Sequence, residues 1–291
     1  MGPSPHGKQQ SGELCEMKKH LSTIILVLVL LAGLSLLLYP TVSNRWNLNH
    51  TSRAISDYNA AVEKIDTTVI DEMWDAAVAY NHDLGSGKID PLFNEEDRQH
   101  YDELLDASDL GIMGYVEIPS LNISLPIYHG TDDAVLMVGI GHVDWSSLPT
   151  GGENTHCVIS GHRGLTSARL FTDIDKLVEG DLFMLNVLDR VMTYEVDQIL
   201  IVLPEELDAV KIRKGEDLCT LVTCTPYGIN SHRLLVRGHR VENLAGEIRV
   251  TADALQIRPV IVAPFVAIPI LLALLLFLLL DKRKPDQEDP M

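Results

Sequence analysis

Two uncharged apolar runs constrain this chain more than any other feature. Leu21–Tyr39 is dominated by Leu, Ile and Val, and Pro259–Leu280 ends in an unbroken stretch of Leu, Ala and Phe. Each run is about as long as a helix must be to cross a hydrocarbon core of ~30 Å. The residues between the runs are mixed and polar. The sequence therefore predicts two transmembrane helices that flank one domain outside the membrane.

Each run also has an alternative interpretation. The first could be a cleaved signal peptide, but it is longer than the usual apolar region of about 7–15 residues, and no A-x-A cleavage site follows it. The second could be a buried core helix, but residues 271–280 leave no polar face. An uncleaved anchor and a second membrane span are therefore favoured.

Basic residues beside the two runs predict their orientation. Lys18 and Lys19 precede the first run. Lys282, Arg283 and Lys284 follow the second. Cytoplasmic loops carry the excess of basic residues, so both tails are expected in the cytoplasm and residues 40–258 outside it.

The charge balance excludes one class of function. The 291 residues include 23 basic and 41 acidic ones, which gives a net charge of −18. A nucleic-acid binder needs a basic face to neutralise phosphates, so this class is disfavoured. The 4 cysteines are too few for a disulfide scaffold and show no C-x-x-C spacing. We expect neither a metal nor a cofactor.

The outer segment begins with a helical pattern. Residues 50–84 carry an apolar stripe at steps of three and four, which predicts one helix; the stripe consists of Ile55, Tyr58, Val62, Ile65, Val69, Met73 and Ala77. Gly85-Ser86-Gly87 ends the pattern, and residues 90–93 form a polar, turn-prone loop. Residues 95–105 are predicted to form a second, short helix.

From Gly114 the pattern changes to short strands. They are rich in β-branched and aromatic residues, and turn-forming residues separate most of them. The predicted strands are Tyr115–Ile118, Ile123–Ile127, Cys157–Ser160, Leu182–Val187, Met192–Val202, Leu218–Thr223 and Arg233–Arg237. Many short strands without alternating long helices predict a closed barrel or a sandwich.

Two predicted strands lead into reactive side chains. One runs into His162, another into Cys224, and Arg233 follows nine residues after that cysteine. A thiolate is a strong nucleophile, a histidine can protonate a departing amine, and a guanidinium can stabilise an oxyanion. Together they suffice for acyl transfer. On spacing alone, an inert buried cysteine, a structural histidine and a surface ion-pair arginine remain alternatives.

The residues around these positions resemble the sortases of Gram-positive bacteria, specifically the pilus-building class C group. The similarity covers about residues 50–245 in one order. It rests on the segments Thr220–Tyr227, Asn230–Arg240, Gly161–Leu165, Leu170–Leu177, Gly114–Pro119 and Leu125–Tyr128. The Thr220–Tyr227 segment resembles the TLxTC signature of the family with its class C extension.

The resemblance implies a mainly β fold: an eight-stranded barrel preceded by helices and a lid loop. It implies that Cys224, assisted by His162 and Arg233, cleaves an LPxTG-like sorting signal between Thr and Gly. The resulting thioacyl enzyme would pass the acyl group to a lysine of the next pilin subunit. Pilins with such a signal are the implied partners.

Class C sortases also share a lid, an Asp-Pro-aromatic motif that covers the cysteine. Asp90 and Pro91 match this motif, but Leu92 stands where the aromatic residue is expected and Phe93 comes next. Either Phe93 has taken the role, or Leu92 covers the thiol with a smaller group. An ordinary Asp-Pro turn is the alternative.

If this loop covers Cys224 at rest, replacing Asp90 and Pro91 together with alanine should speed alkylation of the thiol. The measurement is the rate of iodoacetamide labelling, followed by mass spectrometry. An unchanged rate would contradict the lid role.

Two further features have simple interpretations. Leu148–Gly152 looks like a sorting signal, but its Thr comes one place early, so we expect a turn within the barrel. Cys157 and Cys219 each precede a candidate catalytic residue by five positions, so they could lie level on neighbouring strands. Two buried thiols are favoured there over a disulfide.

The sequence thus divides into seven predicted segments. They are a cytoplasmic tail (1–20), a span (21–39), helices and lid (40–113), a catalytic barrel (114–245), a linker (246–258), a second span (259–280) and a cytoplasmic tail (281–291). Three alternatives to a pilin polymerase stay open: a sortase that anchors proteins to peptidoglycan, a non-catalytic membrane scaffold and a plain cysteine protease.

Overall fold

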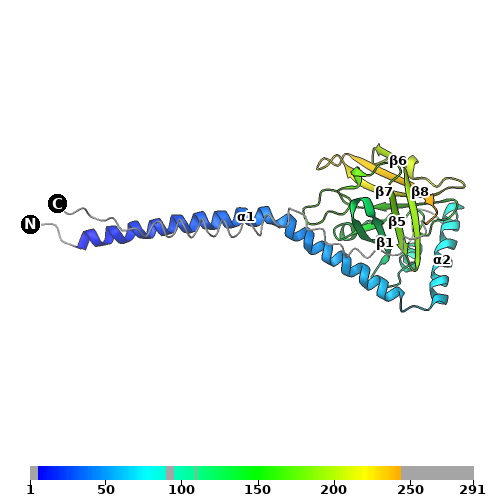
Figure 1. Cartoon of the computed structure of the whole chain (residues 1–291), viewed down its shortest axis with the longest axis horizontal. Coiled ribbons are helices and arrows are strands. Elements are labelled where there is room, and N and C mark those ends of the chain that lie inside the picture. The colour runs from blue at the N-terminus through cyan, green and yellow to red at the C-terminus, as the bar shows by residue number, and fades with distance from the viewer. Residues whose placement is uncertain (1–5, 90–94, 109, 244–291) are drawn as a thin grey trace, which may run out of the picture. The chain divides into compact units, whose positions relative to one another are not determined.

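The structure, a computed structural model, describes residues 6–89, 95–108 and 110–243 (Figure 1). The chain divides into two compact units. The first comprises residues 1–41 and 248–291, and the second comprises residues 42–247. The predicted lid at Asp90–Phe93 and the predicted span at residues 259–280 lie outside the described residues.

Helix α1 (His6–Val62) includes the first apolar run and continues through Pro40. Its part from Ile25 onward is long and apolar enough to cross a membrane. The run at 21–39 is therefore helical, as predicted. The pair of spans stays a prediction, because only this one candidate lies among the described residues.

The prediction of a single helix over residues 50–84 is wrong. Helix α1 ends at Val62, and helix α2 (Thr67–Gly85) begins after a short turn. Asp66 has an extended backbone and accepts a hydrogen bond of 2.9 Å from the Thr68 amide, so it caps α2. The apolar stripe spans the break because both helices pack against the same core, although Val69 is exposed and Ile70 is buried in its place. The short helix α3 (Glu95–Glu103) agrees with its prediction.

From Ile112 to Val241 the chain forms a closed barrel of mostly antiparallel strands. The elements are β1 (Ile112–Ile118), η1 (Pro119–Leu121), β2 (Ile123–His129), α4 (Asp133–Leu136), β3 (Ile140–His142), β4 (Thr155–Ser160), η2 (Ile174–Lys176), β5 (Leu182–Val187), β6 (Arg190–Val202), η3 (Asp208–Val210), β7 (Asp217–Thr225) and β8 (His232–Val241). Around the barrel the strand order is β1-β2-β3-β4-β7-β8-β6-β5.

All seven predicted strands are present, and the closed barrel settles the choice between barrel and sandwich. The eighth strand, β3, was not predicted because it has only three residues and ends in a histidine. It pairs in parallel with β2 and antiparallel with β4, and so completes the wall between them. The segment Leu148–Gly152 is a loop with a turn at residues 149–150, as expected.

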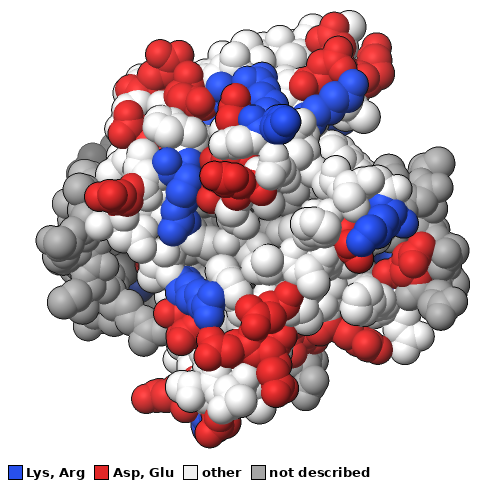
Figure 2. All heavy atoms as spheres, turned by 90° about the vertical axis from the view of Figure 1, so that its right-hand side faces the viewer, with Lys and Arg blue, Asp and Glu red and all other residues white. Residues whose placement is uncertain are grey.

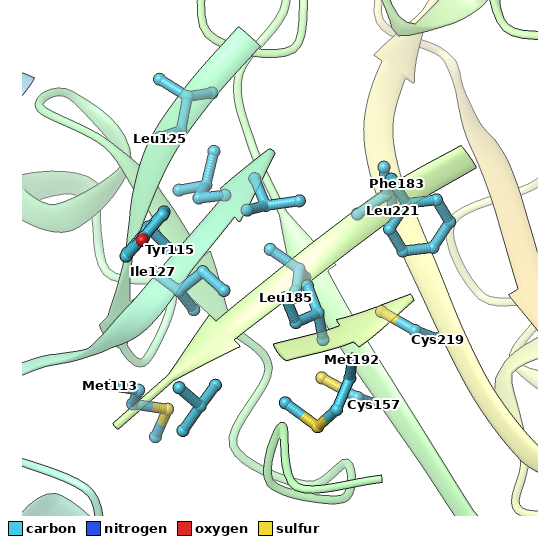
Figure 3. Packing of buried hydrophobic residues seen from close by; sticks show 14 of the residues in the cluster. Met113, Tyr115, Leu125, Ile127, Cys157, Phe183, Leu185, Met192, Cys219 and Leu221 are labelled. Carbon is cyan, nitrogen blue, oxygen red and sulfur yellow. The ribbon is translucent and has the colours of Figure 1, made fainter. Parts of the chain in front are cut away.

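Side chains from the strands fill the barrel, and the helices pack on its outside (Figure 3, Figure 1). Tyr58 of α1 is fully buried. Its hydroxyl donates to the Met113 carbonyl (2.9 Å) and accepts from the Leu188 amide (2.7 Å). In α2, the Asn81 amide group both donates to and accepts from the backbone of Leu148 (3.0 and 2.7 Å). These bonds tie both helices to the barrel.

Cys157 and Cys219 lie opposite each other on the parallel strands β4 and β7, as the spacing predicted. Both thiols are free and buried among apolar side chains (Figure 3). Burial raises the pKa of the Cys219 thiol well above its ordinary value. The Cys219 thiol therefore stays protonated and is a poor nucleophile, and burial of both side chains in the apolar cluster assigns them to the core.

His156 is a buried histidine whose neutral form the fold favours. Its Nδ1 donates to the Lys211 carbonyl (2.9 Å), and its Nε2 accepts from the Thr220 hydroxyl (2.7 Å). Burial lowers the pKa of the imidazole, although the bond to Lys211 opposes this shift. Between the lowered pKa and the ordinary value of about 6.5, the unfolded chain therefore binds a proton that the folded chain does not.

Because His156 binds a proton more readily in the unfolded chain, the free energy of unfolding should fall as the pH drops below about 6.5. The contribution of His156 is at most ~1.4 kcal/mol per pH unit. The slope should be shallower in the His156→Gln variant, because glutamine does not titrate. Urea unfolding of the full chain in a nonionic detergent at pH 7.5 and 5.5 measures both slopes. The matched control is His82→Gln, since the His82 side chain is 77% exposed. Equal slopes for all three proteins would contradict the prediction.

Candidate active site

Strand register brings His162 level with Cys224. Ser160 of β4 pairs with Val222 of β7, and the two strands are parallel. The contact continues one residue further, where the Gly161 amide donates to the Val222 carbonyl (3.0 Å) and the Thr223 hydroxyl donates to the Gly161 carbonyl (2.7 Å). His162 and Cys224 each lie two residues beyond the last register pair. We therefore infer that they lie near each other at the same end of two neighbouring strands.

The same end of the barrel holds Arg233. Strands β7 and β8 are antiparallel, and Cys224 pairs directly with Arg233. Directly opposed residues of an antiparallel pair project to the same face, with Cβ atoms about 5 Å apart. The three predicted catalytic residues thus come from consecutive positions of the barrel wall: the end of β4, then β7, then β8.

Two glycines allow the chain to turn beside His162. A Cβ atom on Gly161 would lie 2.7 Å from the Phe171 ring, so any larger residue would displace the end of β4. Gly164 has a φ of +79°, and a Cβ there would lie 2.8 Å from the Tyr227 ring. Glycine adopts that backbone conformation without strain. Together the two glycines let the histidine loop pack against the loop that follows Cys224.

The surroundings leave the three side chains available for chemistry. Cys224 is half-buried, in contrast to the two core cysteines. Among the described residues Arg233 forms no ion pair; its Nη1 donates to the carbonyls of Asn230 (3.3 Å) and His232 (3.2 Å). Neither ring nitrogen of His162 has a hydrogen-bond partner in the described part of the chain. A thiol, a base and an unneutralised guanidinium side by side can form and resolve an acyl-enzyme.

Arg163 is a residue of this site to which the sequence assigned no role. Its Nη1 donates to the Thr225 hydroxyl (3.2 Å), and its Nη2 forms an ion pair with Asp175. The side chain is only 12% exposed. Arg163 follows His162, and Thr225 follows Cys224, so this arginine joins the two candidate catalytic strands directly. The only sequence signal was its place in Gly161-His162-Arg163-Gly164.

We expect the Arg163→Ala variant to lower kcat for a sorting-signal peptide about tenfold with little change in KM, because relative placement of two reacting groups affects the chemical step. Arg163→Lys should restore part of the loss by keeping the contact with Asp175. The control is Arg169→Ala, which removes an ion pair to Asp173 in the same loop. A rise in KM without a fall in kcat would contradict the positioning role.

No group of three or more His, Cys, Asp or Glu side chains arranged for a metal ion occurs among the described residues.

Comparison with known proteins gives the context of this arrangement. Residues 116–241 match the family model described as the sortase domain. Sortase C1 from Streptococcus agalactiae is 48% identical, with a TM-score of 0.63 over 66% of this chain and 99% of that one. Sortase C from Streptococcus pneumoniae is 43% identical, with a TM-score of 0.58 over 66% of this chain and 98% of that one.

A third structure includes a sorting motif. Sortase C from Clostridium perfringens, with the C-terminal cell wall sorting motif, is 43% identical, with a TM-score of 0.58 over 66% of this chain and all 100% of that one. These matches cover nearly the whole length of each solved chain.

The closed eight-stranded barrel, with cysteine, histidine and arginine on three successive strand ends, belongs to a class of cysteine transpeptidases. The chain is a member of the sortase family, and its structural neighbours are class C sortases.

Proposed function

We propose that this protein is a membrane-anchored sortase that polymerises pilins. In this role it cleaves an LPxTG-like sorting signal and transfers the released acyl group to a lysine of another pilin subunit. The observation that carries the proposal is the strand register, which pairs Cys224 directly with Arg233 and lays β4, the strand that leads into His162, beside β7. Helix α1 supplies the anchor, and the barrel lies outside the cytoplasm.

The first half-reaction forms the thioacyl enzyme. The Cys224 sulfur attacks the Thr carbonyl carbon of the sorting signal, and the carbonyl oxygen becomes an oxyanion. Arg233 donates hydrogen bonds to this oxyanion and offsets its charge. The C–N bond to Gly then breaks, and His162 gives a proton to the departing amine. The product is a thioester on Cys224 and a free Gly amine.

The second half-reaction resolves the thioester. The uncharged amine of a pilin lysine attacks the same carbonyl carbon, and Arg233 again stabilises the oxyanion. His162 accepts the proton that the nitrogen loses, and the thiolate of Cys224 departs. An isopeptide bond forms, and the enzyme returns to its starting state. No cofactor is needed because each proton that His162 gives in the first half is recovered in the second.

Two observations favour pilin as the acceptor over peptidoglycan. The solved relatives described above are class C sortases, and the Streptococcus pneumoniae structure addresses pilin substrate specificity. The Clostridium perfringens structure holds a cell wall sorting motif, which supports the same type of donor peptide here. The predicted lid at Asp90–Phe93 is a further class C feature of the sequence.

The test is incubation of the full chain with a pilin that carries an LPxTG-like signal and an acceptor lysine. A ladder of covalent oligomers that resists denaturing electrophoresis is expected. A pilin whose acceptor lysine is replaced by arginine serves as the control and should give only the thioacyl or hydrolysed product. Cleavage without any ladder, together with coupling to a peptidoglycan amine, would favour the anchoring alternative.

A further inference from the structure

A second concave site lies at the far end of the barrel from Cys224. It has a volume of about 470 Å³, and three arginines line it: Arg213, Arg237 and Arg240. Arg233 is the second residue of β8 and Arg240 the ninth, a separation of about 23 Å along an extended strand. The site is therefore distinct from the candidate active site.

Two guanidinium nitrogens in this site lack a partner. Arg237 is only 8% exposed, and its Nε and Nη2 both donate to Asp197 at 2.9 Å. Its Nη1 is buried and forms no hydrogen bond among the described residues. Arg240 lies over the Tyr194 ring at 5.7 Å, and its Nη1 is likewise buried without a partner. A buried charged donor without an acceptor is unfavourable, so each such group calls for a ligand.

The carboxylates around the site are already engaged. Asp197 accepts both bonds from Arg237. Asp217 accepts from the Tyr194 hydroxyl (3.0 Å) and from the Gly152 amide (2.7 Å). Glu216 lies 3.9 Å from Arg213. Two of these carboxylates thus pair with arginines of the same site, Arg237 and Arg213. Within the described ranges, the buried Nη1 of Arg237 and the buried Nη1 of Arg240 each have no acceptor.

We propose that this site binds an oxyanion, either a phosphate or a carboxylate group. The planar guanidinium fork matches both groups, and an arginine that is held in place loses little side-chain freedom on binding. Acidic side chains spread over the face drawn in Figure 2, and basic ones form small separate groups. In a chain with a net charge of −18, the lining of this cavity is balanced, with three arginines and three carboxylates (Asp197, Glu216 and Asp217).

The test is titration of the full chain, in a nonionic detergent, with inorganic phosphate at constant ionic strength set by chloride. Isothermal titration calorimetry should show saturable binding to the unaltered protein. The Arg240→Gln variant should bind phosphate at least fivefold more weakly, because it loses one of the two free donors. Arg213→Gln is the second variant should the first fail to fold, and it should also weaken binding.

The control is Arg190→Gln, because Arg190 also lies over an aromatic ring (Trp74, 4.3 Å) but does not line the cavity. Its affinity for phosphate should equal that of the unaltered protein. Absence of saturable binding, or equal affinity in the Arg240 and Arg190 variants, would overturn the proposal.

Parallel titrations identify the source of the oxyanion. Acetate should bind more weakly than phosphate, because it carries a smaller charge. A poly(glycerol phosphate) chain that binds more tightly per phosphate than the inorganic ion would identify an anionic polymer as the ligand. Equal affinity per phosphate would identify the free ion. Tighter binding of acetate would identify a carboxylate.

Discussion

Replacing Cys224 with alanine is expected to lower cleavage of an LPxTG-like peptide by about 10⁴-fold or more, because the only sulfur at the aligned strand ends is removed. Cys224 is the half-buried cysteine of the barrel, and its register partner is Arg233, the candidate oxyanion donor. Without the thiol no thioester can form. The measurement is release of the Gly-containing product from a fluorogenic peptide, together with mass spectrometry of the enzyme for the acyl adduct.

Cys157→Ala is the matched control, since it makes the same substitution at a buried cysteine of the neighbouring strand. It removes core volume and should lower the melting temperature, but the peptide should still be cleaved and Cys224 should still carry the acyl adduct. A Cys224→Ala enzyme that retained substantial cleavage would eliminate this residue as the nucleophile. A variant that lost cleavage yet still supported pilus assembly on cells would favour the scaffold alternative.

Much of the barrel could be predicted because its strands carry strong local signals. Val-, Ile- and Leu-rich stretches such as Met192–Val202 are long, and turn residues bound them clearly. Short elements carry no comparable signal. Strand β3 exists because β2 and β4 supply its hydrogen bonds, so its residues 140–142 show no periodicity of their own.

The break between helices α1 and α2 was hard to predict because the apolar pattern continues across it. An apolar stripe reports which residues face the core, and two helices that pack on the same core share one stripe. The break at residues 63–66 therefore left the periodicity intact. The local signal was Asp66, a favourable N-cap followed by two threonines, and it determines where α2 begins.

The candidate site followed from motifs rather than from spacing. Cys224 and Arg233 are nine residues apart, which alone says nothing about contact; a hairpin between β7 and β8 makes them direct neighbours. His162 lies more than sixty residues from Cys224, and only the parallel pairing of β4 with β7 brings the two level. Sequence motifs could not predict the role of Arg163, because that role depends on a hydrogen bond from its side chain to the Thr225 hydroxyl.

The second large effect is expected from the Arg233→Lys substitution. It should lower kcat by about 10²–10³-fold and change KM much less. Lysine keeps the positive charge but has no planar fork, so it cannot present two fixed donors to an oxyanion. Stabilisation of that oxyanion occurs only in the transition state. In other enzymes, removing one hydrogen-bond donor to an oxyanion lowers kcat by about 10²–10³-fold. Steady-state kinetics with the fluorogenic peptide measure kcat and KM separately.

The matched control is Arg169→Lys, because Arg169 pairs with Asp173 four residues away and lysine can keep that ion pair. Its kcat should stay within about twofold of the unaltered enzyme, as is usual for an exposed ion pair. If Arg233 acted only as a positive charge beside the thiol, lysine would preserve most of the activity. A kcat near that of the Arg169→Lys control would therefore refute the oxyanion role, and a selective rise in KM would instead make Arg233 a substrate-binding residue.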